Sequence, residues 1–194
     1  SLGMYIWGTI QDAQRWTVFR LGIYSHNVFI IDDQQQRVYG HSEIDKYKYA
    51  EEFMYSISDI SSFYFNQLKK VTRGVGIKDG KYTVVRDEIE TLDKTTTVRW
   101  NMVTFSAVAL GNKEATLMDN GKTLYLKVLG PDNVEMNYWS TAPTNNYVAE
   151  NPGTIMVGFE CEVPANTSQA FEVILVPERV DTEATFLNIT LDEW

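Results

Sequence analysis

Short strand-like runs, each closed by turn-forming residues, recur along most of the 194-residue chain and restrict its fold more than any other feature. Residues 95–102 alternate between polar and apolar side chains, which is the period of a half-buried strand. Asp79-Gly80 and Asn120-Gly121 each separate two such runs and favour hairpins, because these residue types tolerate positive φ. The pattern predicts strands at residues 15–20, 26–32, 36–39, 53–60, 71–78, 81–87, 95–102, 115–118, 123–129, 134–139, 154–163, 170–176 and 185–191.

Helical periodicity is weak by comparison. Residues 47–54 have room for a turn or two of helix, and residues 59–67 fit helix and strand about equally. Many short strands without a long amphipathic helix favour one sheet packed on another, because each strand then buries one face and exposes the other. We therefore predict a single all-β domain over residues 1–194, an antiparallel two-sheet sandwich of the supersandwich type with little helix.

Charge and hydropathy narrow the classes of function. The net charge of −9 opposes general nucleic-acid binding, because an acidic surface repels phosphate polymers. No apolar run approaches the roughly 20 residues of a membrane-spanning helix. Residues 1–10 have neither the basic start nor the cleavage pattern of a signal peptide, although an export signal that has been removed stays compatible with the sequence.

Motifs for nucleophilic catalysis are missing from the sequence. There is no Gly-x-Ser-x-Gly elbow, Cys-x-x-Cys pair or His-Glu-x-x-His run. Cys161 is the sole cysteine, so an internal disulfide is impossible, and its alternation with apolar neighbours predicts a small buried side chain.

Asp87, Glu88 and Glu90 are close in sequence, and a solvated strand end explains them better than a carboxylate pair for glycoside hydrolysis.

The two histidines are the scarcest titratable residues. His41 is interpreted as a surface strand residue. His26 opens an apolar strand next to a loop, where a rigid sheet can present a ligand. On its own it is better explained as a structural histidine, because zinc sites need three or four ligands and no adjacent pair here has ligand spacing.

A family resemblance rests on three neighbouring segments. They are residues 11–20 with Arg15-Trp16 and Phe19-Arg20, residues 24–32 with Ser25-His26-Asn27, and residues 36–40, which read Gln-Arg-Val-Tyr-Gly. This combination resembles the β-sandwich of heparinase II/III-like polysaccharide lyases. Residues 82–87 and 97–100 resemble later strands of that sandwich in a more generic way.

The resemblance implies a protein longer than this chain. Such lyases join an upstream α/α-toroid to a C-terminal β-sandwich and cleave uronic-acid polysaccharides, glycosaminoglycan-like chains among them, by β-elimination. Their catalytic groups come chiefly from the toroid and from a His-x-His strand early in the sandwich. Neither segment is in this sequence, so the resemblance predicts a chain without its first strand or strands, inactive alone, and part of a periplasmic or secreted enzyme.

The same resemblance assigns His26 as a ligand of a structural zinc whose other ligands lie in the missing segment. A missing first strand would also leave an open sheet edge, which favours pairing with a second copy as a homodimer. The expected partners are thus an acidic polysaccharide, the toroid and a second copy of the chain.

Two other classes of function stay open. One is a free-standing carbohydrate-binding sandwich that stacks sugar rings on Trp7, Trp16, Trp100, Trp139 or Tyr147, although alternation favours core positions for Trp16 and Trp100. The other is a structural interaction domain. Residues 140–153 form the longest predicted loop, either a binding element or a mobile segment.

Overall fold

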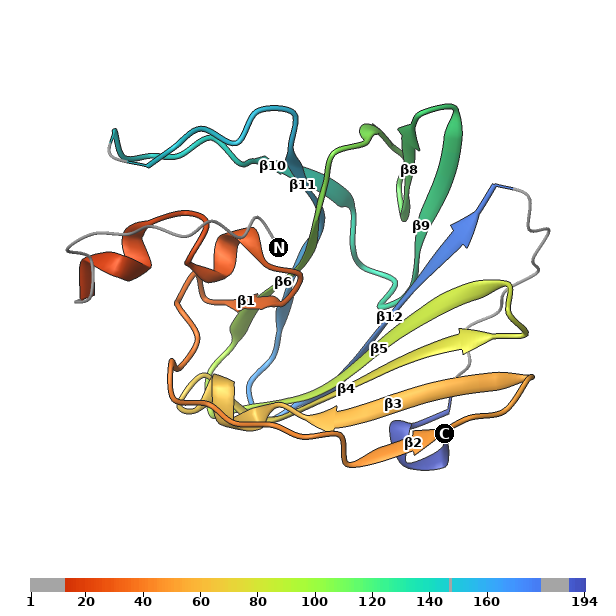
Figure 1. The fold of residues 1–194 in the computed structure, drawn as a ribbon. Helices are drawn as coiled ribbons and strands as arrows, with labels where there is room; N and C mark the ends of the chain where they lie inside the picture. The colour runs from red at the N-terminus through yellow and green to blue at the C-terminus, as the bar shows by residue number, and fades with distance from the viewer. Residues whose placement is uncertain (1–12, 147, 179–188) are drawn as a thin grey trace.

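The computed structural model describes residues 13–146, 148–178 and 189–194, and it is built from two antiparallel sheets (Figure 1). The smaller sheet contains, in spatial order, β1 (Phe29–Ile31), β6 (Thr96–Thr104), β11 (Ile155–Val163) and β10 (Met136–Ser140). The larger sheet contains β2 (Lys46–Lys48), β3 (Phe53–Asp59), β4 (Leu68–Lys78), β5 (Tyr82–Thr91), β12 (Ser168–Pro177), β9 (Lys122–Gly130), β8 (Glu114–Asp119) and β7 (Ala107–Leu110). The predicted all-β sandwich is confirmed.

Helix is confined to short 3₁₀ turns in the described residues. These are η1 (Ala13–Thr17), η2 (Ile23–Ser25), η3 (Ser61–Tyr64) and η4 (Leu191–Glu193). No helix in the described part of the chain is long and apolar enough to span a bilayer.

Both predicted hairpins are present. Asp79 and Gly80 join β4 to β5 with φ values of 50° and 63°, and Asn120 and Gly121 join β8 to β9 with φ values of 49° and 70°. Positive φ at both turn positions matches the right-handed twist of the flanking strands. Local turn chemistry therefore sets the register of these two pairs.

The main core lies between the sheets. Alternation in β6 and β11 points Val98, Trp100 and Phe159 inward, and β12 contributes Phe171 from the larger sheet. Phe171 meets Phe29 edge to face, with ring centroids 5.2 Å apart. Each such side chain contributes about 1.5–3 kcal/mol by leaving water. The predicted core position of Trp100 is confirmed, whereas Cys161 is only partly buried at the margin of this core.

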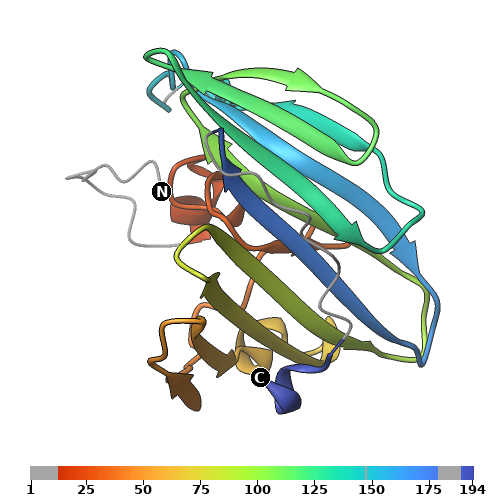
Figure 2. The same cartoon turned by 90° about the vertical axis from the view of Figure 1, so that its right-hand side faces the viewer.

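A second apolar cluster covers the outer face of the larger sheet, whose strands are seen side by side in Figure 2. Its centre is the C-terminal segment, where Leu191 and Trp194 pack over Gly74 of β4. A side chain at Gly74 would meet Leu191 Cδ2 at 2.4 Å, so this close packing requires glycine. Trp194 also meets Phe53 and Tyr55 edge to face, with centroid distances of 4.8 and 5.6 Å.

Some predicted strands near the N-terminus are wrong. Residues 15–20 form the end of η1 and a turn, in which the Val18 amide donates to Arg15 O and the Leu21 amide to Val18 O. Residues 36–39 form no strand, and the predicted strand at 26–32 is shortened to β1. Alternation alone does not distinguish a strand from a segment lying across a sheet. Most of the predicted strand at 185–191 lies outside the described residues.

The prediction that Asp87, Glu88 and Glu90 form a solvated strand end is wrong for Asp87. Its side chain is fully buried and receives two hydrogen bonds from Arg73, at 2.5 and 3.0 Å. Glu88 is partly buried and accepts from Arg86 at 2.9 Å. Strand alternation places Asp87 on the core face, and the paired guanidinium makes that position tolerable.

Candidate functional site

His26 ends η2 and is held by its backbone. Its amide donates to Ile23 O at 3.0 Å, and its carbonyl accepts from Asn101 Nδ2 at 3.0 Å. Burial lowers the pKa of His26 below its ordinary value, so the imidazole is neutral near pH 7, the form that ligates metals. The described residues bring together no group of three His, Cys, Asp or Glu side chains, and the assignment of His26 as a zinc ligand stays a prediction.

His41 lies apart from any such site. It is exposed in the segment before β2 rather than in a strand, and its backbone amide donates to Ser62 Oγ at 2.8 Å. Ser62 Oγ in turn donates to His41 O. The surface position that the sequence predicts is confirmed, although the strand is not.

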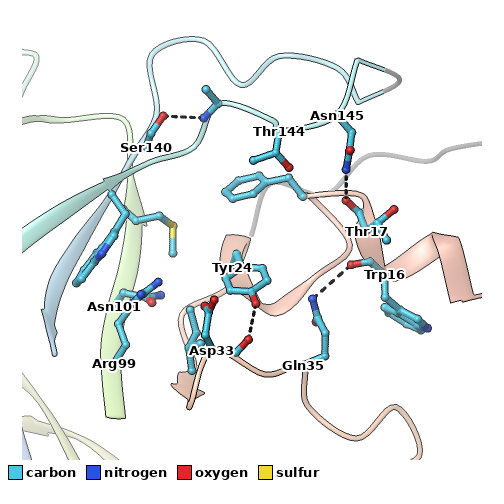
Figure 3. Close-up of a pocket in the computed structure, with 15 residues that line it drawn as sticks. Trp16, Thr17, Tyr24, Asp33, Gln35, Arg99, Asn101, Ser140, Thr144 and Asn145 are labelled. Carbon is cyan, nitrogen blue, oxygen red and sulfur yellow. Dashed lines mark hydrogen bonds between the residues drawn. The ribbon is translucent and has the colours of Figure 1, made fainter. Parts of the chain in front are cut away.

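A pocket of about 780 Å³ lies on the outer face of the smaller sheet. The N-terminal 3₁₀ turns and the loop between β10 and β11 lie over that face, as Figure 1 shows. Figure 3 shows the lining residues, which come from the floor strands, from both N-terminal turns and from the loop. The pocket thus joins segments that are far apart in the sequence.

The floor of the pocket is the outer face of β6, β10 and β11, and strand alternation decides which side chains lie on it. Because Trp100 faces the core, its neighbours Arg99 and Asn101 face outward on β6. Trp139 of β10 pairs with Met156 of β11 on the same outer face. At Gly158 the strands approach closely, since a Cβ there would lie 1.9 Å from Trp100 O.

Side-chain amides brace the walls. Gln35 accepts from the Ile23 amide at 3.1 Å and donates to Trp16 O at 3.3 Å, which joins the two N-terminal turns. Tyr24 donates through Oη to Asp33 O at 2.8 Å. These bonds hold Trp16 and Tyr24 at the pocket before any ligand is present.

The β10–β11 loop is tied to the same wall. Asn145 Nδ2 donates to Thr17 O at 3.4 Å, and the Arg20 guanidinium donates to Asn151 Oδ1 and to Glu150 O. Asn151 also donates to Thr141 O at 2.7 Å across the base of the loop. The location of the predicted long loop is confirmed, and it is a lining element of the pocket.

The electrostatics of the pocket suit binding rather than acid–base chemistry. Burial and the neighbouring Asp33 raise the pKa of Tyr24, so its phenol stays protonated at neutral pH. Arg99 stacks on Trp139 with Cζ 4.6 Å from the ring centroid and donates to Glu160 Oε2 at 2.9 Å. Among the described lining residues there is no histidine.

Asn101 is the most unusual polar residue of the floor. The residue is only 2% exposed, Nδ2 donates to His26 O, and Oδ1 has no hydrogen-bond partner within the part of the chain that the structure describes. A buried acceptor without a donor costs about 1–3 kcal/mol, so such atoms are usually completed by water or ligand.

The aromatic residues that the sequence suggested for sugar stacking have different positions in the structure. Trp16 and Trp139 line the pocket, so the expected core position of Trp16 is wrong, and Trp7 and Tyr147 lie outside the described residues. Sequence reasoning did not single out Arg99, Asn101, Tyr24 or Gln35 for this site. The alternation of residues 95–102 already placed Arg99 and Asn101 on one face, but nothing local indicated that the N-terminal turns cover it.

Comparisons with solved structures identify a shared fold. Heparan sulfate lyase HepC from Pedobacter heparinus aligns at a TM-score of 0.61 with 17% identity, over 78% of this chain and 24% of that chain. A mutant of HepC aligns at 0.69 with 15% identity, over 91% and 28%. A heparinase III gene product with methylated lysines aligns at 0.66 with 17% identity, over 93% and 27%.

The chain therefore spans 24–28% of the length of these solved chains, and at 15–17% identity the likeness shows a common fold. No known family profile matches the sequence. No curated protein matches it either.

Proposed function

We propose that this chain is the β-sandwich part of a heparinase II/III-like lyase, and that its pocket holds a saccharide unit of the polymer. The observation that carries the proposal is the shared two-sheet fold, which extends over most of this chain. The Ser25-His26-Asn27 segment, which the sequence resemblance singled out, adjoins the pocket floor through the bond from Asn101 to His26. The polymer expected is a uronic-acid polysaccharide.

The reaction expected of the longer protein is β-elimination. A base takes the proton beside the uronate carboxylate, the bond to the leaving sugar oxygen breaks as a C=C bond forms, and an acid protonates that oxygen. Such chemistry needs a positioned base, acid and carboxylate neutraliser in one cleft. Among the described lining residues, the titratable groups are the Tyr24 phenol, whose pKa is raised, the Asp33 carboxyl group, and Arg99, which is paired with Glu160. We therefore assign the catalytic base and acid to the upstream toroid and the first sandwich strands.

Zinc belongs to the same proposal. His26 is neutral near pH 7, and its backbone carbonyl is held by Asn101, so its imidazole can serve as one ligand while the upstream segment supplies the others. In the longer protein we expect zinc bound in a one-to-one ratio, and we expect His26→Ala to lose it while His41→Ala retains it. Elemental analysis of the purified proteins measures this. Full zinc occupancy in His26→Ala would contradict the assignment.

The setting and assembly follow from the same resemblance. We infer a periplasmic or secreted enzyme that meets an acidic polysaccharide, with the toroid as a covalent neighbour. The larger sheet ends at β2 and β7, whose residues are mostly exposed, and a second copy can pair on such an edge.

A free-standing carbohydrate-binding module is the second candidate, and the pocket favours it. Trp16, Trp139 and Tyr24 supply aromatic surface, and amides of Gln35, Asn101 and Asn145 supply polar contacts, which is the composition of sites that hold small polar ligands. This candidate predicts the same binding but no lyase activity in any longer form.

One experiment separates the candidates. The 194-residue chain and the longer gene product are each incubated with heparan sulfate, and the ultraviolet absorbance of unsaturated uronate ends is followed. We expect product from the longer protein and none from the 194-residue chain. Turnover by the chain alone overturns the assignment of catalysis to the upstream part, and inactivity of the longer protein favours the binding module.

A further inference from the structure

The orientation of the Asn101 amide is set by its surroundings. His26 O can only accept, so the NH₂ group must face it, and the measured Nδ2–O distance is 3.0 Å. Oδ1 is thereby turned to the other side, where no donor from residues 13–146, 148–178 or 189–194 meets it. In Figure 3 the Asn101 side chain projects from β6 toward the space beside Tyr24.

Asn101 Oδ1 can therefore accept a hydrogen bond from a bound ligand. A hydroxyl or an amide N–H of a ligand can satisfy Asn101 Oδ1, whereas a carboxylate or a sulfate has only acceptor oxygens. Because the side chain is 2% exposed, the discrimination occurs where water competes least.

The charges of the pocket also disfavour an anionic ligand. Its cation, Arg99, is already committed to Glu160 at 2.9 Å and to the face of Trp139 at 4.6 Å. Asp33 adds a carboxylate to the wall. An anionic sugar would therefore meet the Asp33 carboxylate and a guanidinium that is already neutralised by Glu160.

The remaining surface is apolar and aromatic. Trp139 and Met156 lie side by side on the floor, and Trp16 and Phe19 line the wall. The apolar face of a sugar ring packs well on such a surface, while its polar edge reaches the amides.

We propose that this pocket is selective for an uncharged sugar unit that donates a hydrogen bond to Asn101 Oδ1, and that it does not take the uronate. The inference rests on the proposed function, since it names the kind of sugar held in the same pocket. In an alternating polymer, the uncharged unit would sit here while the uronate stays outside. The donor is either a ring hydroxyl or the N–H of an acetamido group.

Calorimetric titration of the 194-residue chain tests the proposal with three probes. They are a tetramer of N-acetylglucosamine, a tetramer of glucose and a tetramer of galacturonate. We expect the first or the second to bind at least about tenfold more tightly than the third, because the galacturonate carboxylate meets the like charge of Asp33 and an Arg99 that is already paired with Glu160. Preference for the first identifies the acetamido N–H as donor, and equal binding of both identifies a hydroxyl.

Variants connect the binding to the pocket. Trp139→Ala should abolish it, whereas Tyr138→Ala, which removes a 56% exposed aromatic from the opposite face of the same strand, should not. Asn101→Leu should weaken neutral-sugar binding by at least about fivefold. Glu160→Gln releases Arg99 and should strengthen galacturonate binding several-fold while neutral binding stays constant.

The outcomes distinguish a failure of the proposed selectivity from a failure of the saccharide pocket itself. Binding that prefers galacturonate and depends on Trp139 overturns the selectivity but leaves a saccharide pocket. Neutral-sugar binding that survives Asn101→Leu also overturns it. If none of the three probes binds, the saccharide pocket of the proposed function fails as well.

Discussion

At the scale of single residues, the buried ion pair of Arg73 and Asp87 stands out because it lies at the core face of the larger sheet. Burial raises the pKa of Asp87, and the paired Arg73 acts against that rise. Arg73 also donates to Asn27 O at 3.0 Å and lies 5.4 Å from the centroid of Phe29. The pair thus joins β4 to the segment that enters the smaller sheet.

Arg73→Met should lower the free energy of unfolding by about 3–5 kcal/mol, because it leaves a buried carboxylate without its partner. Adding Asp87→Leu should restore most of the loss, since no charge is then buried. Urea unfolding followed by circular dichroism measures both. Lys69→Met, which breaks the exposed pair with Glu90, is the control and should cost under about 1 kcal/mol.

Tyr64 is a second buried titratable residue. Its hydroxyl accepts from Gln36 Nε2 at 2.6 Å and donates to Phe29 O at 3.3 Å. Burial raises the pKa of Tyr64 to about 12. The phenol is an acid whose neutral form is favoured by folding, so its contribution is complete below the unfolded pKa of about 10 and is lost as the pH rises toward 12.

We therefore expect the urea midpoint to fall between about pH 10 and pH 12, with a loss of up to about 3 kcal/mol from this residue. Tyr64→Phe should flatten the decline, and Tyr39→Phe, at an 89% exposed position, should leave it unchanged. An identical alkaline profile for wild type and Tyr64→Phe would show that Tyr64 does not ionise differently on folding.

At the scale of elements, the C-terminal segment is attached by both packing and hydrogen bonds. Thr190 and Glu193 form a capping box around η4, and the Leu191 amide donates to Glu88 Oε1 at 3.0 Å. Arg86 links that same Glu88 to the buried Glu172 of β12, with bonds of 2.9 Å to each. Residues 189–194 therefore cover part of the outer face of the larger sheet, around Gly74, Phe53 and Tyr55.

Gly74→Ala should displace this segment, because the new methyl group would lie 2.4 Å from Leu191 Cδ2 and 2.9 Å from the Trp194 ring. We expect a loss of about 1–3 kcal/mol in unfolding free energy and faster hydrogen exchange in residues 189–194. Mass spectrometry of peptides after exchange measures the second effect. At Gly111→Ala the new methyl group would lie 3.1 Å from the flexible Glu114 Cγ and at an ordinary 3.5 Å from Glu114 O, so this variant should change neither quantity.

A secondary-structure element can be predicted from the sequence when residues within the element determine its backbone conformation. The hairpins at Asp79-Gly80 and Asn120-Gly121 were predictable, because the turn residues themselves impose the backbone angles. Residues 15–20 carry a strand-like alternation but form a 3₁₀ turn, because their backbone bonds close within the segment. Alternation put Asp87 on the core face, but the sequence did not show that Arg73 on the neighbouring strand would pair with it there.

At the scale of the whole molecule, the strand edges differ in how well they are protected. β2 carries Lys46 and Lys48, and lysines on an edge discourage pairing with another chain. β7 has the sequence Ala-Val-Ala-Leu, without a charge, and Leu110 is 38% exposed. The proposed homodimer is therefore expected to form through β7.

Sedimentation equilibrium should show reversible dimers of the 194-residue chain, and Ala109→Lys on β7 should make the chain monomeric. Tyr47→Lys, which adds the same charge at a 78% exposed position of the β2 edge, serves as the matched control and should leave the equilibrium constant within about twofold. A chain that stays monomeric at every concentration contradicts the proposal.

The sequence by itself determined the class of fold, both hairpins and which face of each long strand is apolar. These properties depend on residues that are neighbours in the chain, so a period of two and a pair of turn residues are enough to specify them. The pocket was decided only by tertiary structure. Trp16, Asn101 and Trp139 line one pocket because β6 and β10 flank β11 and because Gln35 and Arg20 hold the N-terminal turns and the loop over these strands. No local sequence pattern predicts such long-range contacts. For the same reason, no local pattern predicts that Asn101 Oδ1 is buried without a hydrogen-bond donor.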